Sequence, residues 1–431
     1  MRKMIFIFLV LTGNLYGQIG NWTEQVSGIN SQLVSVSSTS SSNCAWTCGN
    51  GIVLRTTNTG INWQNVSPSA LPVGGQLVNI FGISSSIALA AGNKGTLSFI
   101  IRTTNGEINC SIVLSQGGTI FNAIWMTSNL NGFMEGNPVG GRWALWKTTD
   151  GGANWDSTGL YLSTAITETG YNNSLFCNGT NIWFGTNNSK IFMSSNSGLN
   201  WTARLISATT GIYALCFSWP GYTEGYAGGN SLYATTNSGL NWNFTTSIGT
   251  GNFGGITSTN LPVENPLLGY PIWYVRSDNK IYASTVMGNW NIDFTAPSGI
   301  YKHISQAMPG RGIWAVRDNG GISFHTIIAG IEKISSDIPE NFELFQNYPN
   351  PFNPTTKIKF EIPSDVKREM SDLKLVVYDI LGKEITTLVN EQLQPGTYEV
   401  TFDGSNYPSG IYFYKLIAGN FIETKKMLLI K

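Results

Sequence analysis

Short apolar segments bounded by turn residues run through the first 330 residues of the chain. Gln76 to Ile83 and Ile212 to Ser218 are mostly apolar, and Ser231 to Thr235 alternates between apolar and polar residues. Gly-Asn pairs such as Gly49-Asn50 and Gly136-Asn137 follow the ends of other predicted strands. Segments of this length with turn chemistry at their ends predict β-strands rather than helices. We therefore expect an all-β protein.

One eight-residue phrase returns at a fixed interval. TTNTGINW ends at Trp63, TTDGGANW at Trp155, SSNSGLNW at Trp201 and TTNSGLNW at Trp242, with looser copies that end at Cys110 and Trp290. The interval of 41 to 48 residues is typical of a four-stranded propeller blade. Asn or Asp at the third position and Gly at the fifth supply a tight turn. The tryptophan can fill the gap between neighbouring blades.

The two ends of the repeated region complement each other. Asn21-Trp22 looks like a tryptophan strand without its three predecessors, and the last repeat, from Gly299 to Ile328, lacks its fourth strand. Pairing the two ends would close a ring of seven blades and remove its exposed sheet edges. We therefore expect a seven-bladed β-propeller over residues 18–328, with Trp22 close to the strands around Trp314.

The phrases resemble the Asp-box, or bacterial neuraminidase (BNR), repeat of propeller proteins, whose pattern is Ser/Thr, any, Asp, any, Gly, any, any, Trp. The resemblance covers about residues 19–328 and is closest to the seven-bladed group that includes photosystem II assembly factor-like proteins. Asn replaces Asp in every good copy except the one with Asp150. In this family the box is a fold element remote from the active face, so it implies no chemistry.

The last hundred residues follow a different pattern. Charged residues are sparse before residue 339 and much denser after it, which favours a domain boundary. Short alternating strands separated by Gly and Pro turns predict an immunoglobulin-like β-sandwich over 341–431, behind a linker at 329–340. The phrases NYPNPFNPTTKIKFEIP, VYDILGKEI and PGTYEVTFDGSNYPSGIYFYKL resemble the type A C-terminal sorting domain of the type IX (Por) secretion system. The resemblance implies passage across the outer membrane and the secretion machinery as a partner.

The N-terminus fits export. Arg2 and Lys3 precede an apolar run from Met4 to Leu11 and then small residues, the order of a secretory signal peptide, here 1–17. Only 12% of residues are charged and the net charge is zero, against about 25% charged residues in typical domains. No basic region points to nucleic acid, and no later segment is apolar enough to span a membrane. We expect a secreted or outer-membrane surface protein that reaches the periplasm first.

Few residues suggest metal or cofactor chemistry. The five cysteines are an odd number for an oxidising compartment, so at least one stays unpaired, and buried thiols are the simplest interpretation. There is no CxxC motif, and the only histidines are His303 and His325. We expect no metal and no cofactor.

Candidate binding residues come from the turns between the second and third strands of each blade. These turns lie on the face where propellers commonly bind ligands. Arg276 with Asp278, and Arg317 with Asp318, occupy one repeat position in neighbouring blades and form the best polar patch. Arg142 and Trp143 lie near the same face. A glycosidase would need two carboxylates about 5 to 10 Å apart, for which Glu135, Asp278 and Asp318 are the candidates.

Two functions remain open on this evidence. Loops rich in Asn and Trp with little charge can hydrogen-bond to and stack on sugars, or contact another protein, without catalysis. The first hypothesis is therefore a non-catalytic binding or adhesion module for glycan or protein, exported by the type IX route. The alternative is a secreted glycoside hydrolase, sialidase-like or other, with carboxylates at the propeller mouth. The sequence has no Phe/Tyr-Arg-Ile-Pro phrase of the sialidases.

Overall fold

In the computed structural model, strands are the only regular secondary structure among the residues that it describes. Those residues are 22–39, 43–68, 71–106, 110–165, 167–206, 211–218, 222–258, 272–284, 289–305, 312–325, 331–335, 339–363, 373–391, 393, 395–404 and 407–431. The predicted signal peptide, 1–17, lies outside them.

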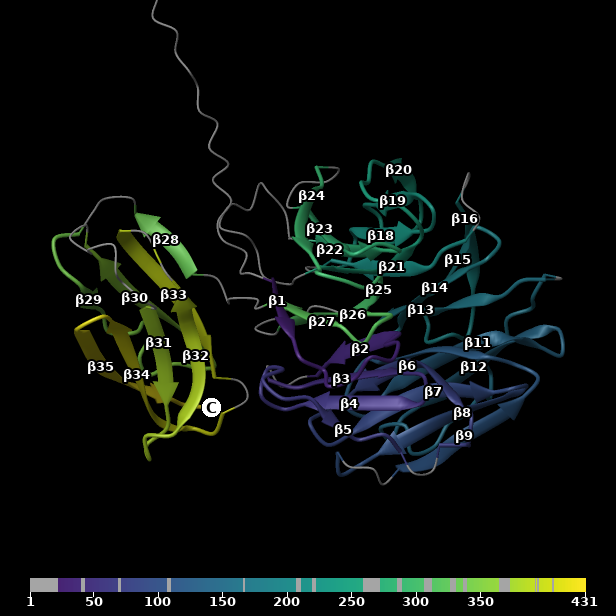
Figure 1. Ribbon diagram of the computed structural model, residues 1–431, viewed down its shortest axis with the longest axis horizontal. Coiled ribbons are helices and arrows are strands. Elements are labelled where there is room, and N and C mark those ends of the chain that lie inside the picture. Colours follow the sequence, from purple (N-terminus) through teal and green to yellow (C-terminus); the bar gives the residue numbers. More distant parts are fainter. Residues whose placement is uncertain are drawn as a thin grey trace, which may run out of the picture.

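Seven sheets form the blades of a propeller (Figure 1). Blades 1 and 2 consist of β2 (Ser35–Ser38), β3 (Ala45–Gly49), β4 (Ile52–Thr56), β5 (Gln64–Asn65), and of β6 (Gln76–Gly82), β7 (Ala88–Lys94), β8 (Leu97–Thr103), β9 (Cys110–Gly117). Blades 3 and 4 consist of β10 (Phe121–Met126), β11 (Gly132–Val139), β12 (Arg142–Thr148), and of β13 (Gly170–Asn178), β14 (Asn181–Thr186), β15 (Lys190–Ser194), β16 (Thr202–Leu205). Blades 5 and 6 consist of β17 (Ala214–Phe217), β18 (Gly225–Gly228), β19 (Leu232–Thr235), β20 (Asn243–Thr245), and of β21 (Phe253–Ser258), β22 (Ile272–Arg276), β23 (Lys280–Ser284), β24 (Asn291–Thr295).

Blade 7 is completed by the start of the chain, as predicted. It consists of β25 (Tyr301–Ile304), β26 (Ile313–Arg317), β27 (Ile322–His325) and β1 (Trp22–Gln25). β1 pairs antiparallel with β27, with Trp22 opposite His325. The Trp314 indole N–H donates to Gln25 Oε1 at 3.2 Å. The ring is therefore closed by a strand from its other end, which leaves no open sheet edge at this junction.

The repeated phrase forms the same turn in each good copy. The Thr56 hydroxyl accepts from the amide of Gly60 at 2.8 Å, and Asn58 Oδ1 accepts from the amide of Asn62 at 3.0 Å. The corresponding distances in the copy with Asp150 are both 2.9 Å. An amide oxygen and a carboxylate oxygen thus make the same turn contact, which explains why Asn replaces Asp without altering the fold.

Tryptophans of the phrase pack between consecutive blades. Trp155 lies against the cluster shared by blades 2 and 3, Trp201 against that of blades 3 and 4, and Trp242 against that of blades 4 and 5. Each large ring fills a wedge that widens outward from the axis, and its burial stabilises the fold by about 2–3 kcal/mol. The fixed position of the tryptophan therefore follows from the spacing of the blades.

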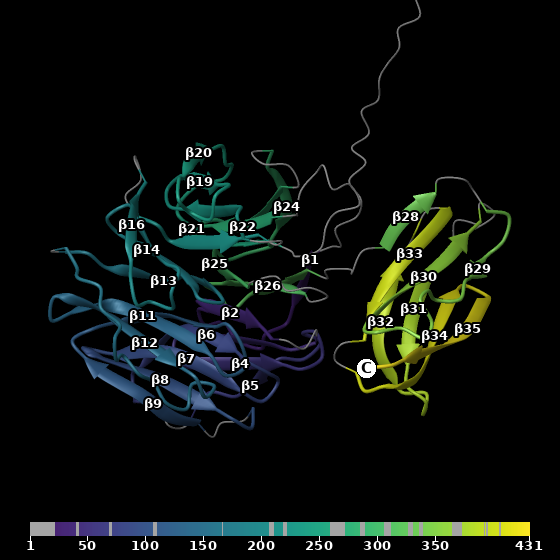
Figure 2. The same cartoon turned by 180° about the vertical axis from the view of Figure 1, so that it is seen from behind.

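The C-terminal part is a β-sandwich of two sheets (Figure 2). One sheet, in the order β28-β33-β30-β29, consists of β28 (Ile331–Ser335), β33 (Gly396–Asp403), β30 (Thr355–Ile362) and β29 (Glu343–Leu344). The other, in the order β32-β31-β34-β35, consists of β32 (Glu384–Glu391), β31 (Leu373–Tyr378), β34 (Gly410–Ala418) and β35 (Phe421–Leu429). Alternate residues such as Phe360, Leu375 and Tyr414 fill the core between them.

One boundary differs from the prediction. Residues 331–335, assigned to the linker 329–340, form β28 and pair with β33. The segment IEKIS alternates between apolar and polar residues, a pattern that suits an edge strand. It supplies main-chain partners to an edge of β33 that would otherwise be open. The rest of the predicted linker, apart from residues 339 and 340, lies outside the described residues.

Candidate functional site

The chain enters every innermost strand on one face of the propeller, and the turns between second and third strands lie on that same face. We call it the entry face. A small cavity of about 50 Å³ lies on the axis and is lined by residues of all seven innermost strands, among them Ser37, Asn79 and His303. A cavity of this size holds only a few water molecules. The axis is therefore not an open pore for a ligand.

Asn173 crosses the axis. β13 has extra residues between Gly170 and Leu175, where its pairing with β14 shifts register, and Asn173 sits there with a φ of 65°. Its Oδ1 accepts from the Ser35 hydroxyl and from Asn79 Nδ2, both at 2.8 Å. Blade 4 is thereby tied to blades 1 and 2. Sequence reasoning missed this contact, and its only signal was the long, Asn-rich start of β13.

His303 lines the same cavity from blade 7. The Val36 amide donates to His303 Nδ1 at 3.1 Å, so this nitrogen carries no proton. Loss of solvation lowers the pKa of His303 to about 4, because the enclosed channel disfavours a charged ring. His303 is therefore neutral at physiological pH, and it supports the channel wall rather than proton transfer.

Arg276 is bonded within the propeller. Its Nε donates to the carbonyl of Gly251 at 2.8 Å and its Nη2 to that of Asn230 at 3.0 Å. The guanidinium also lies 4.6 Å from the centre of the Phe253 ring, and the residue is 6% exposed. The side chain thus clamps the connection between blades 5 and 6, and its donors point away from solvent.

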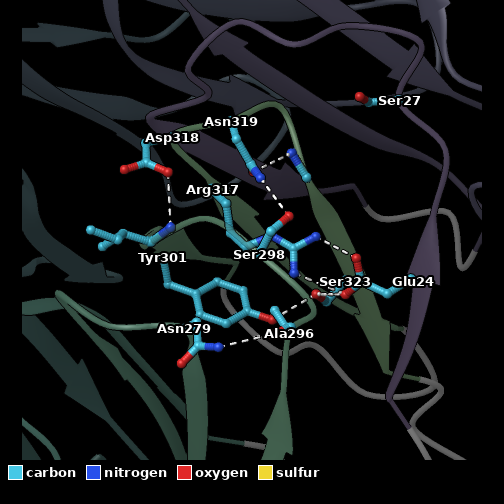
Figure 3. A network of polar contacts seen from close by, with 12 residues as sticks. Glu24, Ser27, Asn279, Ala296, Ser298, Tyr301, Arg317, Asp318, Asn319 and Ser323 are labelled. Carbon is cyan, nitrogen blue, oxygen red and sulfur yellow. Dashed lines mark hydrogen bonds and ion pairs between the residues drawn. The ribbon is translucent and has the colours of Figure 1, made fainter.

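Arg317 occupies the same register in blade 7 but has an acidic partner. Its two terminal nitrogens pair with both carboxylate oxygens of Glu24, on the closing strand β1. Ser323 Oγ donates to Glu24 Oε1 at 2.6 Å and shares a hydrogen bond with the Tyr301 hydroxyl (Figure 3). Gly321 leaves room for the guanidinium, since a Cβ there would collide with Arg317 Nη2. The network fastens β1 to blade 7.

Asp278 and Asp318 bond mainly to backbone at the entry face. Asp318 Oδ1 accepts from the Ile300 amide at 2.8 Å, and Asn187 Oδ1 makes the equivalent bond to Thr169 at 2.8 Å in blade 4. Asp278 accepts from the Lys280 amide at 2.9 Å and from the Tyr282 hydroxyl at 2.7 Å. Asp318 therefore holds a connection, as the amide of Asn187 does in blade 4, and Asp278 holds the turn that follows β22.

Glu135 does not reach the propeller surface. Its side chain is 0% exposed and lies where Gly170 of blade 4 packs against blade 3, with a Cβ on Gly170 falling 2.9 Å from Glu135 Oε2. Asn122 Nδ2 donates to Oε2 at 3.3 Å, whereas Oε1 is buried without a hydrogen-bond partner. The carboxyl is thus enclosed between two blades.

The register of the repeat makes Glu135 unusual. The residues at its position in other blades are Ala91, Val275 and Val316, which follow from the shared pairing of the innermost and second strands. Burial raises the pKa of Glu135 to about 8, because a charge without compensating partners is unfavourable in the core. Glu135 is therefore protonated at neutral pH, with no second carboxyl among its described neighbours.

Trp143 and Arg142 do not belong to the polar patch predicted from Arg276, Asp278, Arg317 and Asp318. Trp143 is 2% exposed and packs between blades 3 and 4, with its ring 4.8 Å from that of Phe184. It is therefore not available to a ligand at the surface. Arg142 is exposed at the start of β12. Of the six predicted ligand residues, the structure leaves Arg142, Asp278 and Asp318 at least partly accessible and commits Arg276, Arg317 and Trp143 to the fold.

An aromatic pair lies where two innermost strands begin. The rings of Tyr171 and Tyr213 are 4.2 Å apart, and both residues are half-buried. Burial and the neighbouring Tyr213 raise the pKa of Tyr171, so its hydroxyl stays neutral. Asn172 beside the pair is exposed, and Lys302 occupies the bulge of blade 7. These residues offer ring faces and hydrogen-bonding groups near the starts of innermost strands. Lys302 Nζ also lies 3.9 Å from Asp318 Oδ2.

The remaining chemistry is sparse. None of the five cysteines forms a disulfide, and only Cys110 is not buried. Burial raises the pKa of the Cys44 thiol to about 11. No group of three His, Cys, Asp or Glu side chains that could hold a metal occurs among the described residues. Within the same residues, no helix is long and apolar enough to cross a membrane.

Known proteins match the two parts of the chain separately. Residues 346–431 match the family model of the secretion system C-terminal sorting domain. No curated protein matches the chain. The solved structure of YCF48 from Cyanidioschyzon merolae is similar at 16% identity and a TM-score of 0.54, covering 71% of this chain and 99% of that one.

Two further structures are similar. YCF48 bound to D1 peptide has 14% identity and a TM-score of 0.52 over 71% of this chain and 96% of that one. An ancestral GH74 enzyme has 13% identity and a TM-score of 0.51 over 94% of this chain and 63% of that one. At these identities the likeness concerns the propeller fold alone. The protein therefore consists of a seven-bladed β-propeller followed by a C-terminal sorting domain that directs it to type IX secretion.

Proposed function

We propose that the propeller is a non-catalytic binding module for an extracellular glycan or protein. In this proposal the signal peptide 1–17 takes the chain to the periplasm, and the sorting domain 341–431 takes it to the cell surface or medium. The propeller of residues 18–328 is the part that acts there. The sorting domain is the evidence for this destination. The propeller is the part to which we assign binding.

The proposal rests on the positions, burial and hydrogen bonds of the three candidate carboxylates. Hydrolysis of a glycosidic bond needs two carboxyl groups that face one cleft. Glu135 is enclosed between blades and protonated, and it lies in blade 3, whereas Asp278 and Asp318 belong to blades 6 and 7. The last two accept backbone hydrogen bonds. A binding role makes no such demand on paired carboxylates.

The mouth of the blocked channel is the binding surface that we propose. Tyr171 and Tyr213 present partly exposed rings that can stack on a sugar or an apolar side chain. Asn172 adds hydrogen-bonding groups that carry no charge. A ligand would rest on the entry face, because the bonds of Asn173 block the axis beneath it.

A glycan array and a hydrolysis screen on the purified mature chain test this proposal. Binding should fall about tenfold or more in Tyr171→Ala and Tyr213→Ala, in proportion to a lost stacking contact of about 1–3 kcal/mol. Tyr348→Ala, which removes a tyrosine that is 80% exposed in the sorting domain, is the matched control. Turnover of a glycoside that disappears in Asp318→Asn would instead establish the hydrolase.

A further inference from the structure

The two outer faces of the sorting-domain sandwich differ in character. Side chains alternate along each strand, so every second residue points away from the core. The outer residues of β30 and β33 are Lys357, Lys359 and Glu361, opposite Thr401, Glu399 and Thr397. These residues are polar, as expected for a sheet surface in water, and the aromatic ring of Phe345 beside them is covered by Lys359, whose Nζ lies 4.3 Å from the ring centre.

The charges on that face neutralise one another. Lys357 Nζ lies 2.6 Å from Glu399 Oε1, and Lys359 Nζ lies 3.6 Å from Glu361 Oε1. Thr397 Oγ1 donates to Glu361 at 3.3 Å. The outer face of the sheet β28-β33-β30-β29 thus needs no partner.

The outer face of the sheet β32-β31-β34-β35 combines exposed apolar side chains with charged and polar ones. Its rows across β31, β34 and β35 are Tyr378-Phe413-Lys426, Val376-Lys415-Thr424 and Lys374-Ile417-Ile422, with Ile411 opposite Leu428. Ile422 is 62% exposed and Ile411 is 38% exposed. Ile417 and Ile422 form one apolar group, and Phe413, Ile411 and Leu428 form another; Lys415 and Thr424 lie between the two groups. Apolar side chains grouped in this way differ from isolated apolar residues on a surface.

The charge on this face is mostly positive. Its acidic residue is Glu384 of β32, which stands opposite Tyr378 and accepts from the Thr387 hydroxyl at 2.7 Å. Lys374, Lys415 and Lys426 lie on it, and within the described residues no acidic side chain is within ion-pair distance of any of them. Lys415 Nζ instead lies 5.1 Å from the centre of the Tyr378 ring. A surface with apolar groups and unpaired lysines fits a partner that is apolar and carries acidic groups.

A turn extends this face beyond the end of β31. Asp379 Oδ1 accepts from the amides of Leu381 and Lys383, both at 2.9 Å, so the turn is well ordered. It presents Ile380 and Leu381, which are 67% and 89% exposed. Two adjacent aliphatic side chains on an ordered turn offer a partner a preformed contact with little loss of entropy.

The edge of the same sheet is already occupied at its C-terminal end. The Phe352 amide donates to the carbonyl of Leu428 at 2.9 Å, and the Ile430 amide donates to that of Phe352 at 3.0 Å. Asn350 Oδ1 accepts from the Leu428 amide at 3.0 Å. The segment NPF therefore pairs with the last strand, and a partner that docks here meets side chains of the face rather than main-chain groups of this edge.

We propose that the outer face of the sheet β32-β31-β34-β35 is the surface through which the sorting domain docks onto the secretion machinery. Its occupant is a protein surface that is apolar at its centre and acidic at its rim. The opposite face of the sandwich stays in water. This inference concerns transport alone, so it is independent of what the propeller binds.

Export of the full-length chain in its native host tests the proposal. The double variant Ile417→Glu/Ile422→Glu should lower the amount at the surface and in the medium about tenfold or more, with folded protein retained in the periplasm. The matched control, Thr355→Glu/Thr401→Glu, adds the same charge to exposed positions on the other face and should be exported normally. The charge variant Lys374→Glu/Lys415→Glu keeps the apolar residues and should also reduce export.

Three results would overturn the proposal. Normal export of both the Ile417→Glu/Ile422→Glu and the Lys374→Glu/Lys415→Glu variants would exclude the face from docking. A purified wild-type chain that is a dimer, and that becomes monomeric in Ile417→Glu/Ile422→Glu, would make a second copy the occupant. Flotation of the wild-type chain with phosphatidylglycerol vesicles, lost in the same variant, would show that a membrane is the occupant of the face. Equal melting temperatures of the variants and wild type verify that the face, and not folding, was changed.

Discussion

Replacement of Glu135 by glutamine should make the propeller more stable at neutral pH. The folded protein holds a proton on Glu135 up to a pKa of about 8, from a usual value of 4.5. The unfolded chain gives up this proton above its own, lower pKa. The unfolded state therefore binds fewer protons between these two values, so the free energy of unfolding falls as the pH rises through that window.

The size of the effect follows from the shift. Each unit of pKa difference corresponds to about 1.4 kcal/mol, so wild type should lose about 3 kcal/mol of stability between pH 4.5 and pH 7. The glutamine side chain of the Glu135→Gln variant has no proton to lose, and its oxygen can still accept from Asn122. This variant should therefore match wild type near pH 4.5 and exceed it by up to about 3 kcal/mol at pH 7.

Urea unfolding of the mature chain, followed by tryptophan fluorescence from pH 5 to pH 8, measures this difference. All 14 tryptophans lie before residue 315, so the signal reports the propeller and not the sorting domain. Glu343→Gln, at an exposed position of the sorting domain, is the control and should change nothing. Parallel pH profiles for wild type and Glu135→Gln would show that the Glu135 carboxyl is charged or hydrated in the folded protein, and the reasoning would fail.

Three further changes test other contacts. Arg317→Leu should lower the free energy of unfolding by about 2 kcal/mol, since it leaves Glu24 unpaired at the ring closure, whereas Arg142→Leu at an exposed site should have no effect; equal losses in urea unfolding would contradict this. Asp318→Asn should change stability by less than about 0.5 kcal/mol, because Asn187 makes the same backbone bond in blade 4; a larger loss would show that its charge matters. Iodoacetamide should modify Cys110 first in the native chain, with mass spectrometry identifying the site, and early labelling of a buried cysteine would refute the thiol assignments.

The fold could be predicted because its signals are local. The phrase that ends at Trp201 contains within eight residues the donors, the acceptors and the glycine of its own turn. The tryptophan then packs against the preceding blade, because each repeat places it at the same position in the sequence. Ring closure required one more inference, that a lone tryptophan strand and an incomplete last repeat are complementary. Both steps depend on residues that are close in sequence or equivalent in the repeat.

The site was harder to predict because its contacts are long-range. Arg276 and Arg317 share a register, as the sequence indicated, yet their guanidinium groups have different partners. Arg276 reaches carbonyl groups of blade 5 and of the connection that follows it, and Arg317 reaches a glutamate almost 300 residues away. A repeat position gives the place of a residue but not the direction of its side chain. Carbonyl groups have no signature in the sequence, so the partners of Arg276 could not be identified there.

Glu135 shows what the repeat could still have revealed. Once the blades are aligned by strand pairing, its register holds Ala91, Val275 and Val316 in other blades, so a carboxyl there departs from an apolar position. Such a departure lowers stability and persists only where something compensates for it. Gly170 compensates sterically, because any side chain at that position would collide with Asn122 and Glu135. In this propeller, a polar residue in an apolar register, opposite a glycine of the next blade, is therefore a buried group rather than a rim residue.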